Sequence, residues 1–318
     1  MELSPQNIFE EYCNKLLDKP SATNLLIYII ENYEEDIIRA DSINILGKIN
    51  LKDEKLFNFF ENLLLSDSSE IIRNTSANYI GKNYLNNALS LFKWAIQHET
   101  SYNCLITVIQ YLVKINSPES KFFLIEQVKN IKEIQFLSIE KGFENKKYKK
   151  SLKSLLKTNR IKNFTTTQLA EILINYLTIK NLIEKIPNVY FELDPNTLLV
   201  EELDLSDYLE FEVKGTPWGW KNNIREISEI SGLHNFYHLK RLDLSNNQIK
   251  NIEGLIKLKN LTHLILSNNK ISDLVNLKYL KHFPNLQYLD LYGNSIVDVI
   301  KNEDFNPTIR VLLKRYLE

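Results

Sequence analysis

Glycine, proline and cysteine are all scarce in this chain. Its 318 residues include eight glycines, eight prolines and two cysteines. Tight turns depend on glycine and proline, so their low number disfavours an all-β chain and favours a helical or solenoid organisation. Cys13 and Cys104 lie far apart in helical-looking sequence. We expect both to be reduced, buried thiols of a cytoplasmic protein.

Long apolar runs and an excess of one charge are also missing. The longest apolar stretch, Leu25 to Ile30, is too short to span a bilayer. Residues 1–19 lack the basic and apolar segments of a signal peptide, which again predicts a cytoplasmic protein. The net charge of −1 gives no general reason to expect nucleic acid or an anionic membrane as a partner. The length predicts about two globular domains.

One leucine motif occurs three times in the last third of the chain. Each copy reads Leu-x-x-Leu-x-Leu-x-x-Asn-x-Ile, and the copies begin at Leu239, Leu261 and Leu286. A buried amide left unpaired costs roughly 1–3 kcal/mol, so an asparagine at one position of an apolar repeat predicts a buried side chain that bonds neighbouring turns. The predicted structural ladder consists of Asn247, Asn269 and Asn294.

The motif resembles the leucine-rich repeat, and its spacing of 22 and then 25 residues is similar to the short subclass found in phosphatase regulators and nuclear adaptor proteins. The resemblance implies an α/β solenoid with parallel strands that binds proteins on its concave face. Residues 200–208 form a damaged copy of the motif, and a further coil with Trp220 in a leucine position is expected before Leu239. We therefore predict about five coils, closed by a capping helix over residues 305–316.

Alternation along each strand predicts which side chains form the concave surface. If the leucines at motif positions four and six point inward, positions three, five and seven point outward. The mixture of apolar, aromatic and charged residues at these positions is typical of protein interfaces, although a merely solvated sheet is the alternative. The predicted partner-binding residues are Arg241, Asp243, Ser245, His263, Ile265, Ser267, Tyr288, Asp290 and Tyr292.

A second repeat occupies the N-terminal half. Residues 36–48 match residues 70–82 position for position at a separation of 34, and each block follows a helix-like run. The pattern predicts pairs of antiparallel helices, with fainter pairs over residues 87–117 and 119–156. It resembles the HEAT repeat, which implies an array that holds other macromolecules along a curved face. The resemblance also implies a structural ladder of Asp36, Arg39, Glu70 and Arg73.

Two segments of opposite charge lie between the repeats. Residues 141–162 contain nine Lys or Arg and one acid, while residues 192–212 contain eight acids and no Lys or Arg. Clustered lysines neutralise phosphates, so the basic segment predicts a nucleic-acid or anionic-membrane contact as one interpretation. Leucines at helical spacing favour a solvated helix face instead, and pairing with the acidic segment is a third interpretation.

No pattern of catalytic residues is recognisable. The chain lacks a P-loop, a dinucleotide fingerprint, a nucleophile elbow and a kinase signature. His234 and His238 have the i, i+4 spacing of a helical zinc site, but no third ligand follows nearby. Some arrays that resemble HEAT repeats are DNA glycosylases with a Trp and an Asp on a basic face, yet Trp94 lies in an amphipathic run that favours a core position. We predict no enzymatic activity, cofactor or metal.

These patterns together predict two solenoids. Residues 1–163 are expected to form a HEAT-like α-solenoid, residues 164–197 a connecting helix and N-terminal cap, and residues 198–318 a leucine-rich-repeat domain. The predicted function is that of a non-catalytic protein–protein interaction adaptor, which binds protein partners through the concave sheet and the α-solenoid face. The alternative is nucleic-acid or anionic-membrane binding through residues 146–162.

Overall fold

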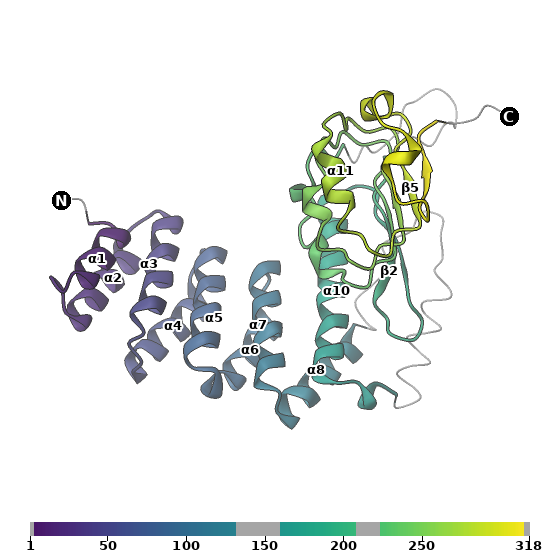
Figure 1. The fold of residues 1–318 in the computed structure, drawn as a ribbon. Coiled ribbons are helices and arrows are strands. Elements are labelled where there is room, and N and C mark those ends of the chain that lie inside the picture. Colours follow the sequence, from purple (N-terminus) through teal and green to yellow (C-terminus); the bar gives the residue numbers. More distant parts are fainter. Residues whose placement is uncertain (1–2, 132–159, 208–222, 315–318) are drawn as a thin grey trace, which may run out of the picture. The chain divides into compact units, whose positions relative to one another are not determined.

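The computed structural model describes residues 3–131, 160–207 and 223–314. The chain forms two compact units, residues 1–126 with 165–170 and residues 127–164 with 171–318. The N-terminal part is all-helical, and a sheet with parallel strands follows in the second unit (Figure 1). Among the described residues, no helix has the length and apolar content required to cross a membrane.

The helices of the N-terminal part begin at residues that cap them. Asp18 and Asp53 each accept a hydrogen bond from the backbone N–H three residues later, at 2.7 Å, which satisfies one of the unpaired donors of the first turn. At the other end, Asn50 and Asn116 take the left-handed conformation that terminates a helix. The helices are α1 (Pro5–Cys13), α2 (Lys19–Asn32), α3 (Asp36–Ile49), α4 (Glu54–Ser66), α5 (Glu70–Asn83), α6 (Leu89–His98), α7 (Tyr102–Ile115) and α8 (Pro118–Asn130).

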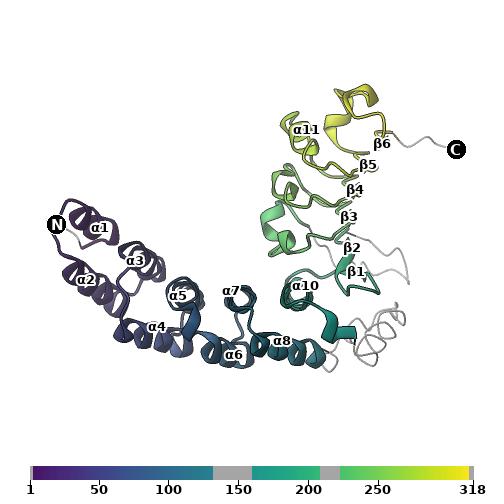
Figure 2. The same cartoon turned by 60° about the horizontal axis from the view of Figure 1, so that its bottom comes forward.

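Consecutive helices pair into hairpins, α2 with α3, α4 with α5 and α6 with α7. Helices α3, α5 and α7 also pack on one another in a row, and α2, α4 and α6 form a second row (Figure 2). Large apolar side chains fill the space between the rows, and Ile43, Phe60 and Phe92 are among those fully buried. The expected helical pairs over residues 22–115 are therefore present. The second half of the fourth expected pair lies outside the described residues.

Arg39 and Arg73 link successive hairpins through acidic residues outside the repeated block, and Arg39 also contacts Asp36 of the expected ladder. Arg39 contacts Asp36 at 3.3 Å and also binds Asp67, the residue that ends α4. Arg73 binds Glu99, the residue that ends α6, at 2.7 Å. Each arginine therefore connects its own helix to the end of the first helix in the next hairpin.

The second unit contains a six-stranded sheet in the order β1-β2-β3-β4-β5-β6. Strands β1 and β2 are antiparallel, and every later pair is parallel. The elements before the sheet are η3 (Arg160–Asn163) and α10 (Thr166–Lys185). The strands are β1 (Tyr190–Leu193), β2 (Val200–Asp204), β3 (Arg241–Asp243), β4 (His263–Ile265), β5 (Tyr288–Asp290) and β6 (Arg310–Leu312). Short helices connect them: η4 (Ile227–Glu229), η5 (Leu233–Asn235), η6 (Glu253–Leu255), α11 (Val275–Leu280), η7 (Ser295–Asp298) and η8 (Asn302–Asp304).

The motif leucines form one elongated core behind the sheet. The central residues of neighbouring strands, Leu203, Leu242, Leu264 and Leu289, stand in register and are each at most 1% exposed. On the other side of the coils the connecting helices stack as closely: a Cβ on Gly254 would lie 2.6 Å from the Ile227 side chain. The spacing of the leucine motif therefore corresponds to one strand for each coil.

The further coil expected between the damaged copy and Leu239 contributes no strand between β2 and β3 in the described part of the sheet, because these two strands pair directly. The damaged motif copy supplies β2, and Leu203 takes the position beside Leu242 that the extra coil was expected to occupy. Residues 223–236 instead form the back of the coil that begins with β2, where Ile227 packs under Gly254. Trp220 itself lies outside the described residues.

The expected C-terminal capping helix is wrong for the described residues 305–314. Arg310–Leu312 forms β6, which continues the parallel sheet with Val311 opposite Leu289. The physical reason is the open edge of β5, whose backbone groups require partners. The Leu291 N–H donates to the Leu312 carbonyl at 3.0 Å, and the Arg310 N–H donates to that of Gln287 at 2.8 Å. Ile309 and Leu313, two of the residues whose spacing suggested a helix, pack against the core together with Val311.

Candidate functional site

Buried asparagines support the carboxyl ends of β3, β4 and β5. The Oδ1 of Asn269 accepts the N–H of Ile249 at 2.9 Å, and its Nδ2 donates to the Leu244 carbonyl in the preceding coil at 2.8 Å. Asn247 and Asn294 make the corresponding bonds in the coils before and after. Each side chain thus satisfies donors and acceptors of two coils at once, which holds the strand ends at a constant spacing.

Two further asparagines, which the motif analysis missed, support the other end of the strands. Asn260 donates from Nδ2 to the Tyr237 carbonyl at 2.6 Å, and Asn285 donates to the Lys259 carbonyl at 3.1 Å. Each stands directly before the first leucine of its motif copy, so the recurring Asn-Leu dipeptide was the available signal. The outward face of the sheet therefore lies between two sets of amide bridges.

One column of side chains crosses the outward face from β2 to β6. The residues that pair across the strands in this first column are Glu202, Arg241, His263, Tyr288 and Arg310. The His263 and Tyr288 rings stack with their centroids 5.8 Å apart, and the Arg310 guanidinium lies 5.9 Å from the Tyr288 ring centroid. The first column therefore combines two charged ends with a stacked ring pair in the middle.

The second column is less accessible than the alternation of the strands predicted. Asp204, Asp243, Ile265 and Asp290 stand in register along it. Ile265 is only 8% exposed and Asp290 only 6%, so the expectation of an exposed isoleucine is wrong. Neighbouring side chains on a narrow sheet bury these short residues, although they point to the outward side. Asp243 and Asp290 also accept the backbone N–H of the residue two positions later, at 3.0 Å, which gives them a structural role.

The third predicted column contributes little to the accessible surface. Ser245 is 8% exposed and Ser267 is 3% exposed, and Ser245 Oγ donates to Asp243 Oδ1 at 2.7 Å. Tyr292 is half-buried and remains at the surface. Of the nine predicted residues, the part that a partner can reach thus comprises Arg241, His263, Tyr288 and Tyr292, with an edge of Asp243.

Carboxylates outnumber cations at the β2–β3 end of the face. Arg241 approaches Glu202 at 3.8 Å and Asp243 at 3.7 Å, both longer than a hydrogen bond. Burial raises the pKa of Asp243, bonds from Ser245 lower it, and the neighbouring Asp204 carboxylate raises it further, with a net rise. This end of the sheet therefore holds closely spaced negative charge.

Three residues of this surface were absent from the sequence prediction. Glu202 and Asp204 occupy the outward positions of the damaged motif copy, so extending the columns back to that copy would have found them. Arg310 could not be found in this way because residues 305–316 were expected to form a helix. The strand pairing alone brings Arg310 beside Tyr288.

A groove follows the beginning of the strands, at the edge opposite to the Asn247 ladder. Glu201 and Lys240 form an ion pair there, and His238, Thr262 and Gln287 line the same groove. Its lining also includes the apolar residues Leu199, Pro284 and Leu286. The groove borders the first column, so a ligand of the outward face has room to extend past this edge.

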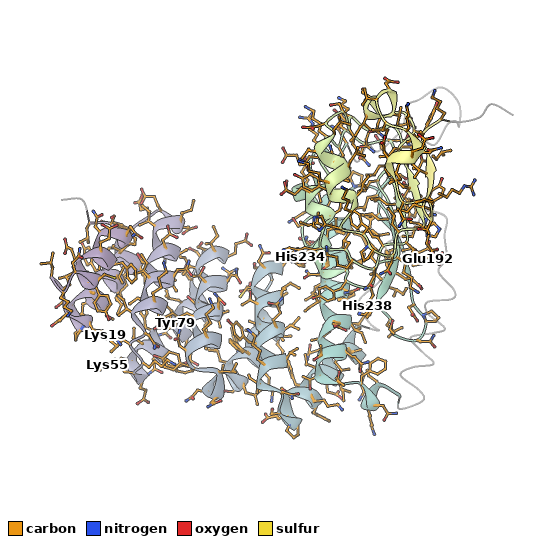
Figure 3. The ribbon with its side chains drawn as sticks, viewed as in Figure 1. Lys19, Lys55, Tyr79, Glu192, His234 and His238 are labelled. Carbon is orange, nitrogen blue, oxygen red and sulfur yellow. The ribbon has the colours of Figure 1, made fainter. Side chains whose placement is uncertain are left out.

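The two histidines with i, i+4 spacing do not share a helix in the described part of the chain. His234 and His238 belong to the turn region before β3 rather than to a long helix (Figure 3). His238 Nε2 lies 3.9 Å from Glu171 of α10, while burial lowers the pKa of His234. Among the residues that the structure describes, no three His, Cys, Asp or Glu side chains meet as metal ligands do.

The two cysteines differ in their surroundings. Cys104 is fully buried in α7, and burial raises the pKa of its thiol. Cys13 is exposed at the end of α1, so the expectation that both thiols are buried is wrong for Cys13. The basic segment over residues 146–162 lies almost entirely outside the described residues.

Comparisons with known proteins identify the repeat of the second unit. A family model described as Leucine Rich Repeat matches residues 238–258, and one described as Leucine Rich repeats (2 copies) matches residues 259–305. No curated protein sequence matches the chain. The chain therefore carries leucine-rich repeats over residues 238–305, which agrees with the strands β3 to β5 and their connections. Such repeats generally mediate protein–protein interaction, and no catalytic family matches.

Proposed function

We propose that this protein is a non-catalytic adaptor that binds a protein partner on the outward face of β2 to β6. The observation that carries the proposal is the accessible column of Arg241, His263 and Tyr288, which stand in register on neighbouring strands. Aromatic and arginine side chains dominate the binding energy at protein interfaces. The rings of tyrosine and histidine lose little conformational entropy on binding, and the arginine guanidinium satisfies several contacts. The asparagine bridges preorganise this column, which lowers the cost of association.

The helical half supplies a second surface in this proposal. Ile37 and Ile71 occupy equivalent positions in α3 and α5, and they are 71% and 43% exposed. Exposed isoleucines repeated at the same position on neighbouring helices favour recognition over a solvated face. We therefore extend the proposal to an array of HEAT-like hairpins that works as an α-solenoid in a cytoplasmic adaptor.

Comparative capture tests the sheet face. The wild-type protein and a Tyr288→Glu/Tyr292→Glu variant are immobilised, incubated with extract of the source cell, and their bound proteins are quantified by mass spectrometry. Leu274→Glu is the matched control, because Leu274 is 53% exposed just before α11 and away from the strands. We expect the double variant to lose a partner that the wild type and the Leu274 variant retain.

The melting temperature of each variant must be measured alongside the capture. A double variant that melts near the wild-type temperature and still retains every partner would refute the sheet-face proposal. The same comparison with Ile37→Glu/Ile71→Glu reports separately on the helical surface.

A further inference from the structure

The charge on the outward face is unevenly distributed. Strands β2 and β3 contribute the carboxylates of Glu202, Asp204 and Asp243 against the single guanidinium of Arg241. Strands β5 and β6 contribute Asp290 against Arg310 and are therefore balanced. Among the Asp, Glu, Lys and Arg side chains of the first and second columns, the excess of two negative charges therefore lies at the β2–β3 end.

The cation that lies closest does not saturate these carboxylates. Arg241 stands 3.8 Å from Glu202 and 3.7 Å from Asp243, beyond hydrogen-bond distance. By contrast, Arg73 in the helical half binds Glu99 at 2.7 Å. Ion pairs at the longer separations leave lone pairs of the carboxylates available to donors from outside the chain.

The end of β2 contains a further unmet acceptor. One carboxylate oxygen of Asp207 is buried and receives no hydrogen bond within the described structure. The Asp207 N–H bonds the Ser245 carbonyl at 3.1 Å, so the residue lies beside the end of β3 and continues the row of acids. A buried acceptor without a donor costs about 1–3 kcal/mol. The accessible acceptors at this end of the face are therefore those of Glu202, Asp204 and Asp243.

We infer that the β2–β3 end of the sheet face binds a basic segment of the partner protein, whose Lys or Arg side chains pair with Glu202, Asp204 and Asp243. This inference rests on the proposed function and specifies the chemistry of the partner. Charge complementarity selects the basic segment over an acidic one, since like charges placed opposite one another cost binding energy. The adjoining rings of His263 and Tyr288 receive an apolar side chain next to the basic ones.

A labelled peptide tests the inference directly. The probe is a fluorescein-labelled peptide of four Arg-Arg-Leu repeats, and its acidic counterpart contains four Glu-Glu-Leu repeats. Fluorescence anisotropy with the full-length protein at low salt is expected to show binding of the basic peptide and none of the acidic one. The basic peptide should lose affinity as the salt concentration rises.

Charge-neutral variants locate the site. Glu202→Gln/Asp243→Asn preserves shape and the Oδ1 acceptor that the Ser245 N–H requires, and should weaken the basic peptide about fivefold to tenfold. Asp273→Asn is the matched control, because Asp273 also accepts an N–H two residues later, from Val275 at 2.8 Å, but precedes α11 on the other side of the coil. This control should bind the basic peptide as the wild type does.

Several outcomes overturn the inference. Equal affinity of the peptide for the wild type and the double variant would do so, as would binding of the acidic peptide. Self-association that the double variant abolishes would identify a second copy of the chain as the occupant instead. If the Tyr288→Glu/Tyr292→Glu variant loses its partner while the carboxylate variant retains both partner and peptide, the adaptor function stands and the basic-segment inference fails.

Discussion

The same Gly→Ala substitution is expected to have different effects on stability at the two helical glycines of the repeated N-terminal block. Gly47 in α3 and Gly81 in α5 occupy equivalent positions, each two residues before the end of its helix. A Cβ on Gly47 would meet only Tyr79, at an ordinary 3.8 Å. A Cβ on Gly81 would lie 2.4 Å from the ring of Tyr111, because α5 and α7 approach closely there.

The expected magnitudes follow from this difference. Gly→Ala within a helix stabilises a protein by roughly 0.5–1 kcal/mol, and this gain is the same at both positions. The Tyr111 ring cannot move aside easily, since it is 4% exposed and its hydroxyl donates to Asn78 at 2.7 Å. Overpacking of this kind costs about 1–3 kcal/mol. We therefore expect the Gly47→Ala variant to be more stable than the wild type. The free energy of unfolding of the Gly81→Ala variant should be lower than that of the Gly47→Ala variant by about 1–3 kcal/mol.

Urea unfolding followed by circular dichroism at 222 nm measures both variants. Adding Tyr111→Ala to each completes a double-mutant cycle, in which only the Gly81 pair should show a coupling energy. If Gly81→Ala stabilises the protein as much as Gly47→Ala does, the close packing of α5 on α7 is refuted.

Two further predictions concern polar groups inside the repeats. Asn269→Ala should lower the free energy of unfolding of the leucine-rich unit by about 1–3 kcal/mol, because it leaves the buried Ile249 N–H unpaired and removes one of the two side-chain bonds to the Leu244 carbonyl. An unchanged urea midpoint would contradict the bridging role. Glu99→Gln should destabilise the helical unit at pH 7 by about 1–3 kcal/mol. Burial disfavours the charged form of Glu99, but bonds from Arg73 and from two backbone N–H groups outweigh it and lower its pKa. Because the pKa is lowered in the folded state, ionised Glu99 stabilises the fold above the ordinary carboxyl range. The difference in unfolding free energy between wild type and variant should therefore shrink as the pH falls through that lowered pKa. A difference that stays constant from pH 7 to pH 3 would contradict the pairing.

The leucine motif predicted the part of the fold that depends on local periodicity. Successive side chains of a strand point to opposite faces of the sheet, so the spacing of Leu242 and Leu244 determines which face belongs to the core without knowledge of the remaining chain. The same holds for the helical pairs of the N-terminal half, whose apolar spacing is set within one or two turns. The order of strands β3, β4 and β5 follows as well, because consecutive copies of one motif stack in chain order.

The tertiary structure decided the accessible surface. Alternation places Ile265 on the outward side, but its 8% exposure depends on the length of the side chains around it on neighbouring strands. The neighbour of β3 was also undetermined, because only pairing reveals that Leu203 of the damaged copy stands beside Leu242 with no coil between them. The arginine ladder follows the same rule. Arg39 and Arg73 are visible in the repeat, whereas Asp67 and Glu99, which bind them, come from turns that the motif does not include.

The end of the repeat shows the limit most clearly. The apolar spacing of residues 305–316 fits a helix, and the segment nevertheless forms β6, since the unpaired edge of β5 stabilises a strand there. Periodicity in a sequence reports which face of a segment is apolar and therefore determines the repeating coils of this protein. Which groups remain exposed, and which backbone edges need a partner, are properties of neighbours distant in the chain, and only the assembled structure determines them.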